Sequence, residues 1–105
     1  ANFVDAVIWR SEAQDRLEDV LDFLAQHPEV DIVVSEVRLR GFNGWTLLEK
    51  IREKHPLLPV ILYSADRKAL SPPAQVKASP DFTLHKPFSI DKLQKIIHEV
   101  GRQRL

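Results

Sequence analysis

The fold of this chain is best approached from Asp31-Ile-Val-Val-Ser-Glu-Val-Arg-Leu-Arg-Gly-Phe-Asn-Gly44. Residues 30–34 form a nearly continuous β-branched run, which is typical of a strand that is covered on both faces. Glu36 follows this run at once, and the loop after it ends in Asn43-Gly44. The stretch therefore predicts a buried strand that places a carboxylate at its carboxyl end.

Strands and helices alternate on both sides of this stretch. Short apolar runs predict strands at 6–9, beginning near Phe3, at 59–63 and at 81–84. Apolar residues at helical spacing predict helices at 12–26, at 44–54 and from Ser89 to near Gly101. Ser11 and Ser89 are the expected N-caps, with Gln14 completing a capping box after Ser11. The stretch 65–79 is weaker, since two prolines at 72–73 interrupt a helix there.

Four strand–helix units with short connections predict an α/β fold, a doubly wound parallel sheet with helices on both faces. In such sheets, function gathers at the carboxyl ends of the strands. Glu36, Ser64 and Lys86 each lie just beyond a predicted strand end, so we expect them to converge in one crevice.

Composition narrows the class of protein. The 105 residues suffice for one domain with one core, and the absence of methionine suggests that residues 1–105 belong to a longer protein. Lys plus Arg equals Asp plus Glu at 15 each, so nucleic-acid binding by charge alone is not expected. No apolar run approaches the roughly 20 residues of a membrane span, and no signal peptide is visible, so we expect a cytoplasmic protein away from membranes.

These motifs, in this order and at these spacings, resemble response-regulator receiver domains over about three quarters of the chain. In that family a strand ends in an aspartate that accepts a phosphoryl group from a histidine kinase, and Glu36 stands at that position. Ser64 matches the Ser or Thr that contacts the phosphoryl group, and Lys86-Pro87 matches a lysine and proline whose peptide bond is usually cis. The resemblance implies a flavodoxin-like, CheY-like fold and assigns the loop positions Gly41, Asn43 and Gly44.

Two departures concern the chemistry of phosphorylation. Glutamate at position 36 either pairs with Lys86 and mimics a phosphoryl group, or reflects drift in a domain that needs no charge there. The acidic pair that holds Mg²⁺ in receivers has no match, because the first strand runs into Trp9-Arg10. Arg10 either replaces the metal with its cationic head or is a solvated loop residue. We therefore expect a degenerate acceptor site with no metal and no cofactor.

Two further departures concern the architecture. Receivers have five strand–helix units, whereas four are counted here. Either residues 3–26 serve as the first unit and the second is deleted, or the chain starts at the second; the helix length favours the first option. The aromatic that usually lies three residues before the lysine is replaced by Thr83, and Phe82 beside it is expected to be core. The four histidines share no metal-ligand spacing and are expected to be exposed.

The leading hypothesis is a pseudo-receiver, a non-enzymatic signalling domain that acts by protein–protein contact without phosphorylation. The competing hypotheses are a phosphorylatable, Mg²⁺-dependent receiver switch and a structural spacer in a multidomain regulator or kinase. The resemblance implies a partner or dimer surface formed by 65–78, 81–84 and 89–102. We also expect self-association through the N-terminal strand. The first surface carries six basic residues: Arg67, Lys68, Lys77, Lys92, Lys95 and Arg102.

Overall fold

The computed structural model describes residues 6–9, 16–39 and 41–103, and for 6–9 and 101–103 it describes the backbone alone. The four strands are β1 (Ala6–Trp9), β2 (Ile32–Glu36), β3 (Val60–Ser64) and β4 (Phe82–His85). The helices are α1 (Leu17–Gln26), α2 (Gly44–Lys54) and α3 (Ile90–Gln103), with a short 3-10 helix, η1 (Arg67–Leu70).

The strands form one parallel sheet in the order β1-β2-β3-β4, which confirms the predicted α/β class. Val33 of β2 pairs with Val60 of β3, and Glu36 pairs with Tyr63. Each new strand is added on the same side of the one before it, so β1 and β4 are the edges. The strand at 6–9 thus lies at a sheet edge next to β2, as expected if the family's second unit is deleted.

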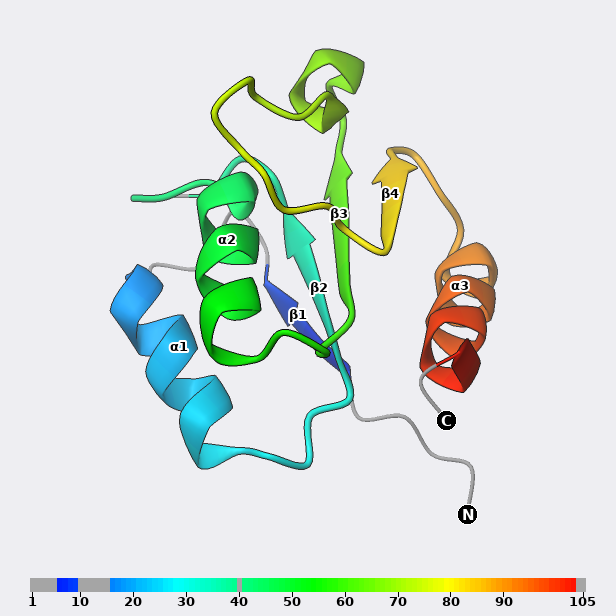
Figure 1. Cartoon of the computed structure of the whole chain (residues 1–105). Helices are drawn as coiled ribbons and strands as arrows, with labels where there is room; N and C mark the ends of the chain where they lie inside the picture. The colour runs from blue at the N-terminus through cyan, green and yellow to red at the C-terminus, as the bar shows by residue number, and fades with distance from the viewer. Residues whose placement is uncertain (1–5, 10–15, 40, 104–105) are drawn as a thin grey trace.

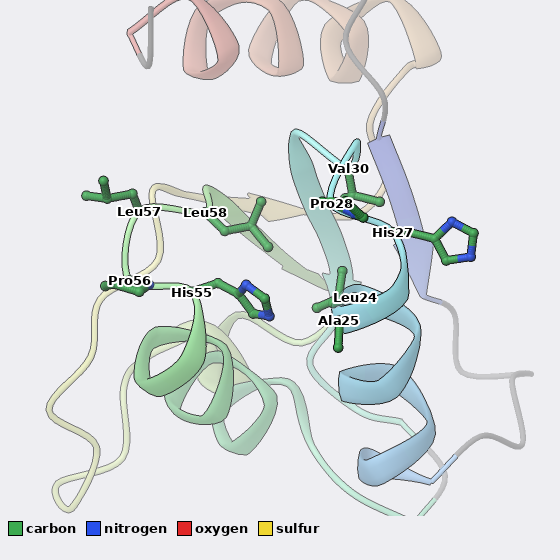
Figure 2. Close-up of a pocket in the computed structure, with 9 residues that line it drawn as sticks. All are labelled: Leu24, Ala25, His27, Pro28, Val30, His55, Pro56, Leu57 and Leu58. Carbon is green, nitrogen blue, oxygen red and sulfur yellow. The ribbon is translucent and has the colours of Figure 1, made fainter.

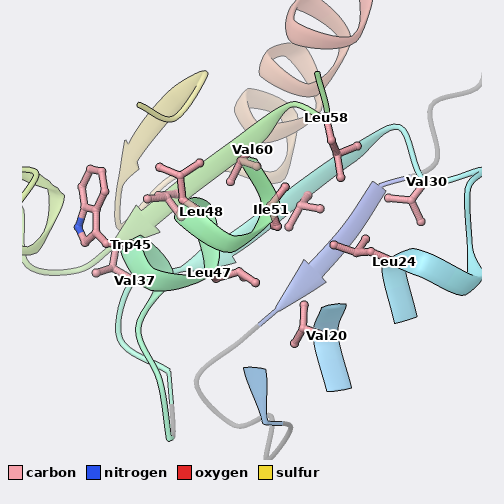
Figure 3. Packing of buried hydrophobic residues seen from close by; sticks show 12 residues of the cluster. Val20, Leu24, Val30, Val37, Trp45, Leu47, Leu48, Ile51, Leu58 and Val60 are labelled. Carbon is pink, nitrogen blue, oxygen red and sulfur yellow. The ribbon is translucent and has the colours of Figure 1, made fainter. Parts of the chain in front are cut away.

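The helices cover the two faces of the sheet unequally (Figure 1). Helices α1 and α2 lie on one face and α3 lies on the other. The physical reason is chirality, since right-handed crossovers between strands added in one direction place their helices on the same face. Figure 3 shows the core beneath α1 and α2, where Val20 and Leu24 meet Leu47 and Ile51. On the opposite face, Leu93 and Val100 of α3 pack against β2, β3 and β4.

The helix starts were only partly predicted. Helix α1 begins at Leu17 rather than near residue 12, and the backbone N–H of Arg16 donates to the Asp19 carboxylate at 3.0 Å. The expected caps Ser11 and Gln14 lie outside the described residues. The prediction for α3 is confirmed, because the backbone N–H of Lys92 donates to Ser89 Oγ at 3.0 Å.

The segment 65–81 contains only η1 and is otherwise irregular, as the two prolines indicated. Polar contacts fix it at both ends. Trp45 Nε1 donates to the carbonyl of Ala69 at 2.8 Å, and the Arg52 guanidinium contacts Asp81 at 2.8 Å. Leu70 and Val76 pack against the core under α2. The segment therefore serves as cover for the sheet without forming a full helix.

Two burial predictions were wrong. Phe82 is 42% exposed rather than core, because β4 is an edge strand and this side chain lies near its start. The histidines are not uniformly exposed: His27, His55 and His85 are partly buried, and His98 alone is exposed. Within the described ranges, every helix is too short or too polar to cross a bilayer.

Candidate functional site

The carboxyl ends of β2, β3 and β4 lie together at one end of the sheet, where the three arrows point in Figure 1. In the description of the site, the word edge means this end and not the edge strands β1 and β4. Glu36 is the last residue of β2, Ser64 is the last residue of β3, and Lys86 follows β4 directly. Because the strands are parallel and in register, these residues arrive at the same edge. The predicted convergence follows from this arrangement.

The central contact of the edge is an ion pair. Lys86 Nζ lies 3.4 Å from Glu36 Oε1, which confirms the predicted pairing. The Glu36 side chain is 13% exposed, whereas the Lys86 side chain is 42% exposed. The carboxylate is therefore largely withdrawn from water, and the ammonium approaches it from the solvent side.

An aromatic contact that sequence reasoning missed also holds Lys86. Its Nζ lies 4.9 Å from the centroid of the Tyr63 ring, within the range of a cation–π interaction. Tyr63 in turn meets Phe88 edge to face, with ring centroids 5.6 Å apart. The sequence alone carried no signal for this contact, because it depends on the register that pairs Tyr63 with Glu36 across the strands.

Ser64 belongs to the same edge and is 2% exposed. Its Oγ accepts a hydrogen bond from the backbone N–H of Asp66 at 3.1 Å, and its carbonyl accepts one from Lys86 at 2.9 Å. The hydroxyl thus caps its own turn, and the carbonyl ties β3 to the start of the next loop. The peptide bond between Lys86 and Pro87 is cis, as expected.

The loop after Glu36 is shaped by its two glycines. Gly41 has φ +84°, a conformation that residues with a side chain rarely adopt. At Gly44 the backbones nearly touch, because an added Cβ would lie 2.8 Å from the Glu36 carbonyl oxygen. Asn43 caps α2 by accepting from the backbone N–H of Thr46 at 2.9 Å. These residues set the path of the chain away from Glu36.

A second ion pair, also missed by sequence reasoning, joins two loops of this edge. Arg38 contacts the Asp66 carboxylate at 2.5 Å. Both side chains are exposed enough that the pair contributes about 1 kcal/mol or less. The loop after β2 is thereby linked to the loop after β3.

The residues after the first strand, where receivers carry their Mg²⁺ ligands, fall within 10–15 and lie outside the described ranges. Among the described residues no group of three or more His, Asp or Glu side chains is placed to hold a metal ion. The Glu36 carboxylate lies against the Lys86 ammonium. Arg10, the expected replacement for the metal, lies outside the described residues, as does the Trp9 side chain.

The expected basic surface is mixed in charge. Arg67, Lys68 and Lys77 are exposed on the segment after β3, and Lys92 and Lys95 are exposed on α3. The acidic Asp91 and Glu99 are exposed on the same helix, and together with Lys95 they border a shallow hollow. The side chain of Arg102 is not described.

A separate hollow of about 290 Å³ lies at the opposite end of the strands (Figure 2). It is bounded by the connections after α1 and α2, where His27-Pro28 and His55-Pro56 occupy equivalent places. Leu57 on its rim is 81% exposed. The pKa of nearby Glu29 is lowered by a hydrogen bond with its own backbone and by the neighbouring His27. None of the predicted site residues lines this hollow.

Comparison with known proteins identifies the family. The model of the response regulator receiver domain matches residues 5–98. The DNA-binding transcriptional regulator NtrC of Escherichia coli is 32% identical over 79 residues, covering 75% of this chain and 17% of NtrC. The sensor kinase CckA of Brucella abortus is 39% identical over 75 residues, covering 69% of this chain and 8% of the kinase. The chain thus spans a small part of these relatives.

Solved structures agree on the fold. A response regulator receiver domain protein from Clostridium thermocellum superposes with a TM-score of 0.81 at 14% identity, covering 97% of both chains. The receiver domain of NtrX from Brucella abortus gives a TM-score of 0.76 at 17% identity, covering 93% of this chain and 98% of that one. The family match, the parallel sheet and the edge formed by Glu36, Ser64 and Lys86 lead to one conclusion: this chain belongs to the response regulator receiver domain family.

Proposed function

We propose that this domain is a pseudo-receiver, a non-enzymatic signalling module that works by protein–protein contact without being phosphorylated. The carrying observation is the contact of 3.4 Å between Lys86 Nζ and Glu36 Oε1. The carboxylate at the acceptor position already has the lysine as its partner. A domain with this pair in place needs no added phosphoryl group to bring the strand ends together.

The charge requirements of phosphoryl transfer support the same proposal. Transfer to a carboxylate passes through a state in which charge develops on the phosphoryl oxygens, and a bound metal ion normally neutralises it. The described residues place no cluster of oxygen ligands for such an ion. Lys86 supplies one positive charge at this edge, and that charge is already paired with the Glu36 carboxylate. Phosphorylation is therefore expected to be slow or absent.

A phosphorylatable receiver remains the second candidate, and one observation favours it. A carboxylate in contact with a lysine, a buried serine and a cis proline after that lysine all lie at the strand ends. If a metal site forms with residues 10–15, Glu36 would be the acceptor. This alternative makes the opposite prediction for the experiment that follows.

The first prediction concerns phosphorylation itself. Incubation with acetyl phosphate or phosphoramidate and Mg²⁺ should leave the intact mass unchanged. A receiver domain with aspartate at the acceptor position, run in parallel, shows that the donor is active. The variant Glu36→Gln is the matched control, since it keeps the size of the side chain but removes the acceptor. A gain of one phosphoryl group in the native chain that is absent from this variant would establish the second candidate.

The same proposal includes the partners. We propose that the domain contacts a protein partner or a second copy of itself through 65–102 or through the edge strand β1, as part of a longer signalling protein. The function that we propose involves no nucleic acid, membrane or cofactor. The exposed basic residues Arg67, Lys68 and Lys77 support the first surface, and the edge position of β1 supports the second.

A further inference from the structure

Tyr63 is a buried aromatic residue whose ring lies against the lysine of the site. We propose that Tyr63 is a positioning residue for Lys86, and that Tyr63 and Phe88 transmit the state of the Glu36–Lys86 pair to the start of α3. The inference rests on the proposed function, because it assigns the path by which a pair at this edge acts on a surface helix.

The register of the sheet places the three side chains together. Glu36 and Tyr63 are paired neighbours on β2 and β3, so their side chains leave the sheet on the same face. Lys86 Nζ lies 3.4 Å from Glu36 Oε1 and 4.9 Å from the centroid of the Tyr63 ring. The ammonium therefore has a carboxylate and an aromatic face as its two neighbours.

Burial makes the ring a fixed reference for the lysine. Tyr63 is 4% exposed and belongs to the core cluster of Ile61 and Leu84. The Lys86 side chain is 42% exposed and has many rotamers, so ordering it costs conformational entropy. A rigid ring with its negative face toward the ammonium limits those rotamers in advance. Tyr63 thus holds Lys86 where Glu36 can reach it.

The second step runs from the ring to the helix. Tyr63 and Phe88 meet edge to face at 5.6 Å with an interplanar angle of 81°. Phe88 directly precedes Ser89, whose Oγ accepts the backbone N–H of Lys92 at 3.0 Å as the cap of α3. The contact between the two rings therefore joins the lysine site to the residue that leads into the cap. Thr83, at the position where receivers usually have an aromatic, is exposed.

Nuclear magnetic resonance can separate a positioning role from plain core packing. Lys86 in the native chain should show ring-current-shifted side-chain methylene signals, because its ammonium lies over the Tyr63 ring. The variant Tyr63→Phe keeps the ring and should keep those shifts. Tyr63→Leu removes the ring current itself, so its readout is mobility: NMR relaxation should show a more mobile Lys86 side chain in this variant. Unshifted Lys86 methylenes in the native chain, or an equally ordered Lys86 side chain in Tyr63→Leu and Tyr63→Phe, would overturn the positioning role.

Transmission is tested by the response of α3 to a change at Glu36. In the native background, Glu36→Gln should shift the backbone amides of Ser89, Lys92 and Leu93. In the Phe88→Leu background that response should disappear, while the Lys86 methylene shifts remain. Lys50→Gln, which breaks an exposed ion pair with Glu53 on α2, is the control for a generic loss of charge. An undiminished response in Phe88→Leu, or an equal one from Lys50→Gln, would refute the path.

These readouts fail independently of the proposed function. Phe88→Leu removes a partly buried ring rather than a fully buried one, so it keeps the test available if Tyr63→Leu does not fold. A mass gain from a phosphoryl donor would refute the pseudo-receiver proposal, whereas the Lys86 shifts of the unphosphorylated chain would still test the role of Tyr63. Lost shifts without any mass gain would refute the role of Tyr63 alone.

Discussion

At the scale of single residues, steric contact decides which side chain can stand at position 44, whereas charge decides what Glu36 contributes. The backbone at Gly44 passes so close to the end of β2 that a Cβ would meet the Glu36 carbonyl oxygen at 2.8 Å and the Val37 Cα at 3.0 Å. Both neighbours are backbone atoms, which cannot move aside as a flexible side chain would. The Glu36–Lys86 pair is not confined by backbone in this way, because the Lys86 side chain reaches into solvent.

The glycines yield a prediction about stability. Gly44→Ala should lower the free energy of unfolding by about 2–3 kcal/mol, because overpacking against backbone forces the chain to shift. Gly41→Ala is the matched comparison: an added Cβ there meets nothing within 4 Å, and only its φ of +84° is strained. It should cost about 1–2 kcal/mol. Urea denaturation of the two variants gives the comparison, and an equal or smaller loss at Gly44 would contradict the steric argument.

The ion pair yields a second prediction. Glu36→Gln should change the free energy of unfolding by about 1 kcal/mol or less, because the pair is partly exposed and screened by salt. Its effect should instead be seen in partner binding if the carboxylate mimics a phosphoryl group. Denaturation in low and high salt measures the first effect. Pull-down of the partner that the native domain binds measures the second, and unchanged binding would favour drift at position 36.

At the scale of elements, the irregular segment 65–81 depends on contacts from α2. Trp45 is 3% exposed and its Nε1 donates to the Ala69 carbonyl, while Arg52 contacts Asp81 and the carbonyls of Ser79 and Leu58. A segment of this length with so little secondary structure is usually functional in a compact domain. Side chains of a neighbouring helix thus add to the few backbone hydrogen bonds that the segment itself makes.

Trp45→Phe tests this dependence. The variant keeps an aromatic ring in the core but removes the donor to Ala69, so it should lower the free energy of unfolding by about 1–2 kcal/mol. Hydrogen exchange should quicken across residues 66–81 more than in α2 itself. Val20→Ala, a core change on α1 away from this segment, is the control for global destabilisation. Exchange that quickens equally in both variants would show that the tether has no local effect.

At the scale of the whole molecule, the sheet has two short edges, β1 and β4. Edge strands present unpaired backbone groups that can pair with another chain. The sequence around β1 is largely apolar, with Asp5 as its one charge between Phe3 and Trp9. At the β4 edge, the side chains of Phe82 and Thr83 are exposed. The segment 65–81, which leads into β4, begins the cover of this side of the sheet.

Self-association through β1 is therefore expected. Light scattering should show an average mass that rises with protein concentration. In the Trp45→Phe background Trp9 is the one remaining tryptophan, so quenching of its fluorescence reports on the N-terminal strand. Quenching should weaken as concentration rises. A constant monomer mass together with a fully accessible Trp9 at every concentration would exclude this mode of association.

Local patterns in the sequence determined much of the fold. β-Branched runs indicated β2 and β3, apolar periodicity indicated α2 and α3, and parallel topology then placed Glu36, Ser64 and Lys86 at one edge. These features depend on short-range periodicity and on the direction of parallel strands. Only the tertiary structure decided that α1 shares a face with α2, that Phe82 is exposed at an edge, and that Tyr63 holds Lys86. The physical reason is that strand order, crossover hand and register are properties of the assembled sheet, which no local stretch encodes alone.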